Sequence, residues 1–154
     1  MKTLWNQALV IGAMLVGTAA LAQADWKTFT DQSNSRCSLS VPADWNRKQG
    51  ELFIRDSSQQ VKIMLLSSMN NLTTARKQVS DTFERNRYSL IRETSDSVLY
   101  RYEADSPSLG RYVGFYALIG YSGGNCKMHM MVPAALAPRF ESLFPRIAGT
   151  LKAR

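Results

Sequence analysis

Hydrophobic and polar residues alternate in several short stretches of the first half of the chain, and each stretch predicts a β-strand. Residues 37–41 alternate small polar and apolar side chains and stop at Pro42. Two further strands are predicted at residues 52–55 and 61–66, separated by a polar turn. Residues 25–36 are mixed and polar, so we expect an irregular lead-in there, anchored by Trp26 and Phe29.

A helical period replaces this alternation after Asn71, a residue type that commonly caps helices. Leu72, Ala75, Val79 and Phe83 recur three or four positions apart and would form one apolar face. Charged residues fall mainly on the other side. The pattern therefore predicts an amphipathic helix that packs on a sheet.

Three more strands are predicted after this helix, at residues 88–92, 97–103 and 111–121. Tyr100 and Tyr102 fall on one side of the second strand. The third carries apolar or aromatic groups on both sides, which is typical of a strand that is covered on both faces. A tight turn at Gly123 and Gly124 leads into a last strand at residues 126–132, which completes a long hairpin.

An apolar stripe at helical spacing closes the chain and predicts a final helix. It comprises Leu136, Phe140, Leu143 or Phe144, Ile147 and Leu151. Pro138 suits the first turn of a helix, whereas Pro145 should bend or interrupt it. The order of strands, helix, strands and helix predicts an α+β fold, an antiparallel β-sheet with helices packed on it.

The first 24 residues differ in composition from the rest. Lys2 precedes an apolar run at residues 8–21, and Ala22 and Ala24 occupy the positions that a signal peptidase inspects. The run is shorter than the roughly 20 residues of a membrane-spanning helix, and no cysteine lies near the cut to carry a lipid. We therefore expect a cleavable signal peptide at residues 1–24, a single domain at 25–154, and a periplasmic protein with no membrane segment after cleavage.

Cys37 and Cys126 are the two cysteines, and both lie in the expected mature domain. An even number of cysteines in an oxidising compartment favours a disulfide. The alternative, a pair of redox-active thiols, lacks the Cys-x-x-Cys spacing that lowers a thiol pKa. A Cys37–Cys126 disulfide would link the first predicted strand to the last.

Basic residues outnumber acidic ones, which bears on the choice of partner. The leader contains Lys2 and no acidic residue. Without it, 18 of the 19 basic residues and 12 acidic residues remain, which gives a net charge of +6. Such an excess favours an acidic partner. The basic residues are spread along the chain and not interleaved with aromatic residues, so we expect no nucleic-acid binding.

The segment Cys-Ser-Leu-Ser-Val-Pro-Ala-Asp-Trp at residues 37–45 and the order of elements after it resemble the PsbP-like and DcrB-like small exported proteins. The matching features are the strand that ends in Val41-Pro42, two strands, the helix near residues 73–87, the aromatic hairpin, and a C-terminal helix that ends near residues 147–152. The resemblance implies an α-β-α sandwich and a family that binds partners more often than it catalyses reactions. This chain lacks the lipidation cysteine of the lipoprotein members.

The sequence contains few side chains that could act together in catalysis. His129 is the only histidine and is expected on the accessible face of a strand. With Met131 it offers an alternative as a soft-metal ligand, but buried methionines are usually core filler. The acid pairs Glu51 with Asp56 and Glu103 with Asp105 lie at turns, where solvated carboxylates are ordinary. We therefore expect no catalytic, cofactor or metal site, and no enzyme.

Exposed tyrosines with nearby arginines are typical of protein interfaces. The candidate partner-binding residues are Tyr100, Arg101, Tyr102, Arg111, Tyr112, Tyr121, Asn125 and His129. Residues 105–110 and the hairpin tip at 122–125 are the expected exposed contact points. We expect a periplasmic binding or accessory protein that contacts another envelope protein. The alternatives are an immunity protein that inhibits a secreted toxin and, ranked below it, a cell-wall-acting enzyme.

Overall fold

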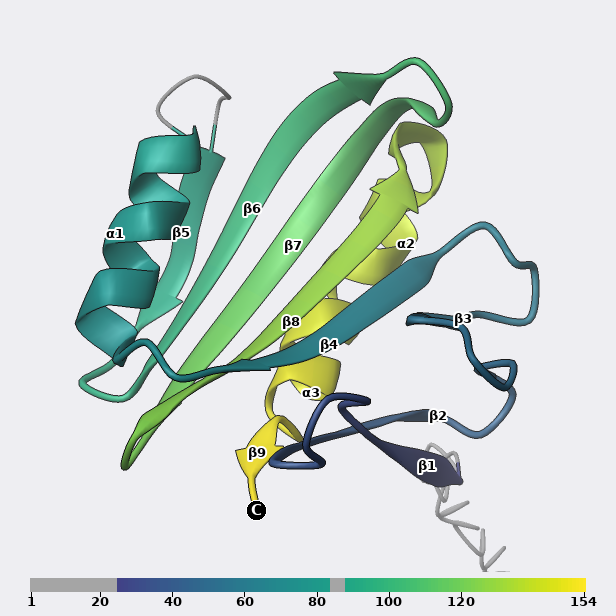
Figure 1. Ribbon diagram of the computed structural model, residues 1–154. Coiled ribbons are helices and arrows are strands. Elements are labelled where there is room, and N and C mark those ends of the chain that lie inside the picture. Colours follow the sequence, from purple (N-terminus) through teal and green to yellow (C-terminus); the bar gives the residue numbers. More distant parts are fainter. Residues whose placement is uncertain (1–24, 84–87) are drawn as a thin grey trace, which may run out of the picture.

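The computed structural model describes residues 25–83 and 88–154, which form two antiparallel sheets and the helices that cover them (Figure 1). The larger sheet has six strands in the order β3-β4-β8-β7-β6-β5. Its strands are β3 (Phe53–Arg55), β4 (Lys62–Ser68), β5 (Tyr88–Glu93), β6 (Ser97–Ser106), β7 (Gly110–Tyr121) and β8 (Gly124–Pro133). The expected signal peptide lies outside the described residues.

A smaller sheet has the order β1-β2-β9, and two of its three strands were not predicted. The lead-in expected to be irregular contains β1 (Trp26–Thr30), which pairs along its whole length with β2 (Cys37–Pro42). The chain ends in β9 (Lys152–Ala153), only two residues long. Both strands are stabilised by their pairing with β2, a distant contact that leaves no local pattern. Trp26 and Phe29 do pack against the core, as expected.

The alternation of side chains along β7 and β8 explains why this hairpin is apolar on both sides. Phe115 and Met128 point into one hydrophobic core, whereas Leu118 points into a second. Helix α1 (Leu72–Phe83) covers the second core, with Ala75, Val79 and Phe83 buried as predicted. The six-stranded sheet is therefore covered on both faces along its central strands.

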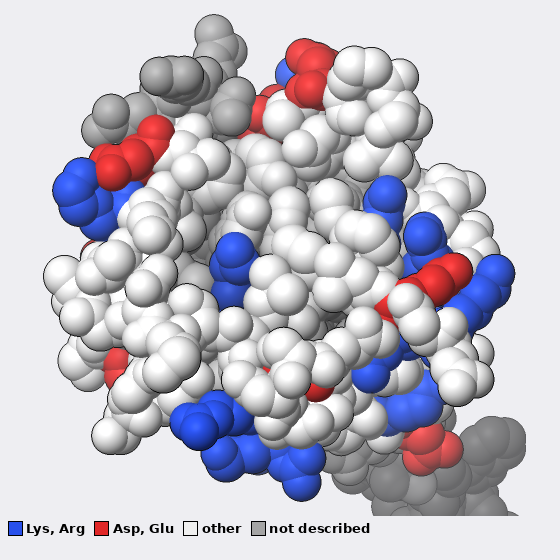
Figure 2. Space-filling model, in the orientation of Figure 1, with Lys and Arg blue, Asp and Glu red and all other residues white. Residues whose placement is uncertain are grey.

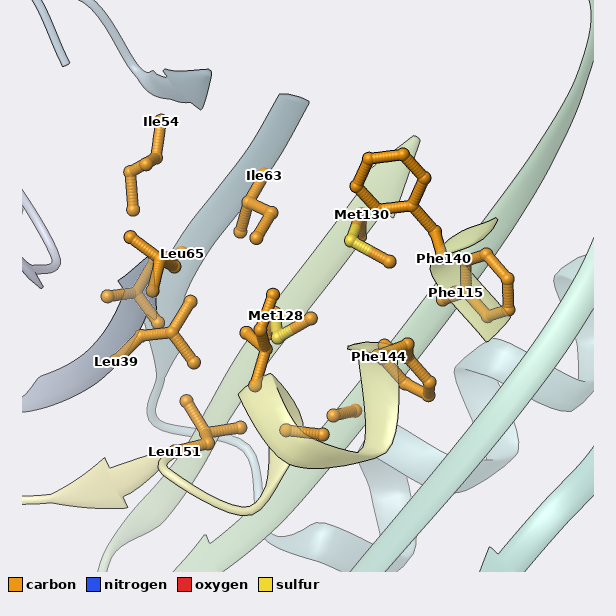
Figure 3. Close-up of a cluster of buried hydrophobic side chains, with 14 of the residues drawn as sticks. Leu39, Ile54, Ile63, Leu65, Phe115, Met128, Met130, Phe140, Phe144 and Leu151 are labelled. Carbon is orange, nitrogen blue, oxygen red and sulfur yellow. The ribbon is translucent and has the colours of Figure 1, made fainter. Parts of the chain in front are cut away.

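The first core lies between the six-stranded sheet, the small sheet and the C-terminal helices. Figure 3 shows Leu39 of the small sheet, Met128 and Met130 of β8, and Phe140 and Phe144 of the helices converging on it. The two methionines are fully buried. They are core filler, as their position on the strand predicted.

The predicted C-terminal helix is divided into two short ones, α2 (Ala137–Glu141) and α3 (Leu143–Ala148), after a single 3-10 turn (Ala134–Leu136). The division falls at Ser142. A proline has no N–H to donate to the carbonyl four residues earlier and its ring crowds that carbonyl, so Pro145 breaks the ladder at Glu141. The interruption expected from Pro145 is confirmed, with the break one turn before the proline.

The disulfide between Cys37 and Cys126 connects β2 of the small sheet to β8 of the large one, with 5.6 Å between the Cα atoms. Both cysteines are fully buried in the first core. With α1 on one face of the large sheet and α2 and α3 on the other (Figure 1), the fold is the predicted α+β, α-β-α sandwich.

Candidate functional site

The eight residues predicted to bind a partner do not form one surface. Arg111 is exposed, and Arg101, Tyr112 and Tyr121 are half-buried. Tyr100, Tyr102, Asn125 and His129 are buried. As they lie, these four support the packing under α1 and the hairpin turn, and they present no surface to another protein.

An aromatic cluster occupies the second core, beneath the C-terminal half of α1. The Phe83 ring stacks on Tyr102 at 4.5 Å between centroids and meets Tyr116 edge-on at 5.2 Å. Gly114 on β7 makes room for this cluster, because a Cβ there would collide with the Tyr102 ring. The tyrosines on β6 and β7 are thus mainly core residues, and the sequence could not tell which face α1 would cover.

His129 is 8% exposed and lies inside this cluster, so the expectation of an accessible histidine is wrong. Its ring stacks on Tyr116 at 4.0 Å, and its Nε2 is 2.7 Å from the Tyr102 hydroxyl. Burial, together with the charge of Lys127, lowers the pKa of His129 to about 3. The imidazole is therefore neutral at pH 7, and its Nε2 shares a hydrogen bond with the Tyr102 hydroxyl.

Burial also shifts the tyrosines around His129. It raises the pKa of Tyr116 to about 12, with a smaller contribution from Tyr112. Burial and a hydrogen bond with Tyr112 raise the pKa of Tyr102 far above its ordinary value. His129, Tyr102 and Tyr116 therefore stay neutral over the physiological range, which suits their packing against one another.

The predicted contact loops differ in exposure. Residues 107–110 at the β6–β7 turn are exposed, and Leu109 is among the exposed large apolar side chains. At the β7–β8 turn, Ser122 and Gly123 are exposed, but Asn125 is 2% exposed and donates a hydrogen bond from Nδ2 to the Asn70 carbonyl at 2.7 Å. Asn125 thus ties the hairpin to the segment before α1.

Two of the four acidic residues considered for catalysis, Glu103 and Asp56, make structural contacts. Glu103 accepts hydrogen bonds from Arg111 and Arg101, and these arginines lower the pKa of its carboxyl group. Asp56 is buried and accepts bonds from the Val61 N–H and the Ser58 hydroxyl. In residues 25–83 and 88–154, no group of three or more His, Cys, Asp or Glu side chains is arranged to hold a metal ion.

Asp31 is a buried acid that the sequence reasoning missed. Its carboxylate accepts hydrogen bonds from the Cys37 and Asn34 N–H groups and from the Ser33 and Ser67 hydroxyls. Burial alone would raise the pKa of Asp31, but these four bonds together lower it. Since Ser67 is on β4, Asp31 fastens the β1–β2 turn to the large sheet beside the disulfide.

Strand β5 is the outermost strand of the large sheet and the most exposed apolar segment described. All six of its residues are exposed, and three are large and apolar: Tyr88 at 38%, Leu90 at 50% and Ile91 at 43%. A bulge between Leu90 and Arg92 interrupts the pairing with β6. An edge strand with exposed apolar side chains is a template on which another chain can pair.

No helix in the described ranges has both the length and the apolar character needed to cross a bilayer. Charged side chains are scattered over the face shown in Figure 2, with basic groups along its margins.

Comparison with known proteins identifies the fold and nothing finer. No family model matches the sequence, and no curated protein matches it. The solution structure of cyanobacterial PsbP (CyanoP) from Synechocystis sp. PCC 6803 is similar, with a TM-score of 0.52 and 15% identity over 88% of this chain and 96% of that chain. A crystal structure from Bacteroides thetaiotaomicron VPI-5482 gives a TM-score of 0.55 and 18% identity over 83% of this chain and 48% of that chain, so this chain spans about half that length.

These similarities define the class as an α+β sandwich of the PsbP type. The PsbP-like fold expected from residues 37–45 and the order of elements is thereby confirmed.

Proposed function

We propose that the protein is an exported, non-enzymatic accessory protein that binds another envelope protein through the outer edge of β5. The observation that carries this proposal is the group of exposed apolar side chains on β5, a strand whose outer edge pairs with no other strand within residues 25–83 and 88–154. Backbone groups on that edge can hydrogen-bond an extended segment of a partner, while Tyr88, Leu90 and Ile91 contact its side chains.

The charges on β5 favour a partner with an acidic group near its paired segment. Glu93 is held by Arg76, whose Nη1 lies 2.7 Å from the Glu93 carboxylate. Arg92, the neighbouring basic residue, is exposed. Together with the net charge of +6 expected for the mature chain, Arg92 favours an acidic partner over a basic one.

Absence of catalysis is supported by the placement of the single histidine. His129 lies behind Tyr116, is neutral and is occupied by Tyr102, so a substrate would have to displace the aromatic cluster to reach it. The resemblance to PsbP-like proteins, which implies partner binding, points the same way. Periplasmic export is also part of the proposal, and the disulfide supports it because such bonds persist in oxidising compartments.

The test is a capture experiment from envelope extract with the mature protein and two matched variants. Leu90→Lys adds a charge to the β5 edge, while Met69→Lys adds the same charge at an apolar side chain that is 89% exposed and outside β5. We expect wild type and Met69→Lys to retain one partner and Leu90→Lys to lose it. Equal recovery by all three proteins would contradict the role of β5.

Two further measurements distinguish the remaining outcomes. If wild type sediments as a dimer that Leu90→Lys converts to a monomer, the β5 edge binds a second copy and the proposal of a different envelope partner is wrong. If the captured partner is an exported toxin whose activity the protein blocks, the immunity alternative holds. Failure to capture any protein from several growth conditions would contradict the binding function as a whole.

A further inference from the structure

The face of the large sheet under α1 continues beyond the helix onto β8 and β4. The pairing register places Lys127 of β8 directly between Leu118 of β7 and Leu66 of β4. The next row toward the hairpin tip contains Asn125 between Gly120 and Ser68. A basic side chain thus lies in the middle of an otherwise uncharged part of the sheet.

Helix α1 covers β6 and β7 but leaves a groove of about 310 Å³ between itself and β4. Val79, Thr82 and Phe83 line the helix side, and Leu66, Leu118 and Lys127 line the sheet side. Figure 2 shows this face hollowed, with mostly uncharged surface around one basic group. The volume is at the lower end of the roughly 300–1,000 Å³ that small-molecule sites occupy.

Lys127 is half-buried, with its Nζ 5.9 Å from the centre of the Tyr116 ring. Across residues 25–83 and 88–154, no carboxylate forms an ion pair with it. Burial lowers the pKa of the ammonium group, since the charged form loses hydration without gaining an anion. An anion in the groove would compensate for that loss.

Two polar residues, Ser68 and Gln78, line the groove together with Lys127 and carry side-chain hydrogen-bond donors. The Ser68 hydroxyl oxygen accepts a bond from the Asn70 N–H, which leaves its hydrogen available. Gln78 on α1 is exposed and also lines the groove, and its side-chain amide carries two N–H donors. By contrast, the Thr82 hydroxyl donates its hydrogen to the Gln78 carbonyl, so Thr82 lines the groove without offering a donor to a ligand.

We propose that this groove binds a small organic carboxylate with an apolar body. The carboxylate pairs with Lys127 and accepts hydrogen bonds from Ser68 and Gln78, while the apolar body packs between Leu66, Leu118 and the Val79–Phe83 face of α1. Charge complementarity selects the anion, and the apolar walls select its body. The site is separated from β5 by α1 and β6, so its test and that of the β5 edge can fail independently.

The test is a titration of isotope-labelled mature protein with octanoate as the probe. Binding is measured from the amide chemical shifts of the protein. We expect saturable shifts at β4, β8 and α1 around the groove. Acetate, which has the charge without the chain, and 1-octanol, which has the chain without the charge, should each bind at least about tenfold more weakly. Equal shifts with octanoate and 1-octanol would show a merely apolar groove and overturn the proposal.

Lys127→Met removes the charge but keeps much of the side-chain volume, and Lys62→Met is its matched control. Lys62 lies on the same face of the neighbouring strand β4, pairs with Met131, and is outside the groove. We expect Lys127→Met to weaken octanoate binding at least about tenfold, because a charge-assisted bond is lost, and Lys62→Met to leave it unchanged. Octanoate binding by Lys127→Met that is as tight as that of wild type would overturn the proposal.

Thermal unfolding without ligand separates binding from folding. Lys127→Met exchanges a half-buried ammonium group and its contact with the Tyr116 ring for an apolar side chain, so its melting temperature should stay close to that of wild type. Weak octanoate binding together with a much lower melting temperature would show that the substitution acts through folding, and would contradict the assignment of Lys127 as the anion-binding group.

Discussion

At the scale of single residues, His129 shows how burial changes the chemistry of a side chain. In sequence it is a lone histidine on a strand, the usual starting point for a general base. In the fold it is stacked on Tyr116, bonded to Tyr102 and next to Lys127. Burial among these rings and the charge of Lys127 both favour the neutral imidazole, so His129 suits the aromatic cluster only while it carries no extra proton.

This arrangement predicts a loss of stability on mild acidification. The pKa of His129 is about 3 in the folded protein and close to 6.5 in the unfolded chain, so below pH 6.5 the unfolded state binds the extra proton. The free energy of unfolding should therefore fall by about 1.4 kcal/mol per pH unit as the pH drops through this interval. Urea denaturation between pH 4.5 and 7.5 measures it.

His129→Gln is the matched variant, because a glutamine amide can donate or accept the hydrogen bond with Tyr102 and does not titrate. Since the sequence contains no other histidine, this variant should show a nearly flat profile between pH 4.5 and 6.5. The same slope in both proteins would mean that His129 is protonated in the folded state, against its position in the cluster.

At the scale of elements, α1 begins with a cap that the sequence pattern located. The Asn71 side-chain oxygen accepts a hydrogen bond from the Thr74 N–H at 2.8 Å, and the Asn71 carbonyl accepts the first helical bond from Ala75. Asn71→Ala should lower the free energy of unfolding by about 1 kcal/mol.

Asn70→Ala is the control for that prediction. Asn70 is the preceding residue and is also exposed, but its hydrogen bonds with Ser68 and Asn125 are made by its backbone, which the substitution keeps. It should change stability by less than about 0.5 kcal/mol. Equal effects of the two substitutions in chemical denaturation would show that Asn71 does not act as a cap.

Helices and strands that leave a pattern in their own stretch of sequence could be predicted. Strands that form only because a distant segment pairs with them could not. The helical spacing of Ala75, Val79 and Phe83 and the two-sided pattern of β7 each determine an element and its buried face. Strand β1 exists because β2 lies beside it, and β9 has only two residues. No short window of sequence carries that information.

The sequence predicted which residues belong to the aromatic group of the candidate site, but it did not predict whether those residues are exposed or buried. Sequence reasoning gathered the tyrosines of β6 and β7 as one group, and the structure does bring them together. These tyrosines are buried because α1 packs on their face of the sheet, and that packing is a tertiary contact that the local sequence does not determine. The run Tyr88-Ser-Leu-Ile91, with two adjacent apolar residues before Arg92, was the available signal for an exposed apolar edge.

At the scale of the whole molecule, the two sheets are joined by the first core, by Asp31 and by the Cys37–Cys126 disulfide. The disulfide closes a loop with a sequence separation of 89 residues. In the chain-entropy model a loop of this length contributes about 4–5 kcal/mol by restricting the unfolded chain. That is a large fraction of the roughly 5–15 kcal/mol by which native domains are stable.

The double variant Cys37→Ala, Cys126→Ala should therefore unfold at a much lower urea concentration than the oxidised mature protein, and reductant should shift wild type toward the same midpoint. The double variant itself should not respond to reductant, which controls for effects on the solvent. Native protein whose two thiols react with an alkylating agent before reduction would contradict both the crosslink and the export proposed from it. With the crosslink removed, the core and the hydrogen bonds of Ser67 with Asp31, Ser33 and Asn34 still hold β1 and β2 to the large sheet, so amide exchange should accelerate first in the small sheet.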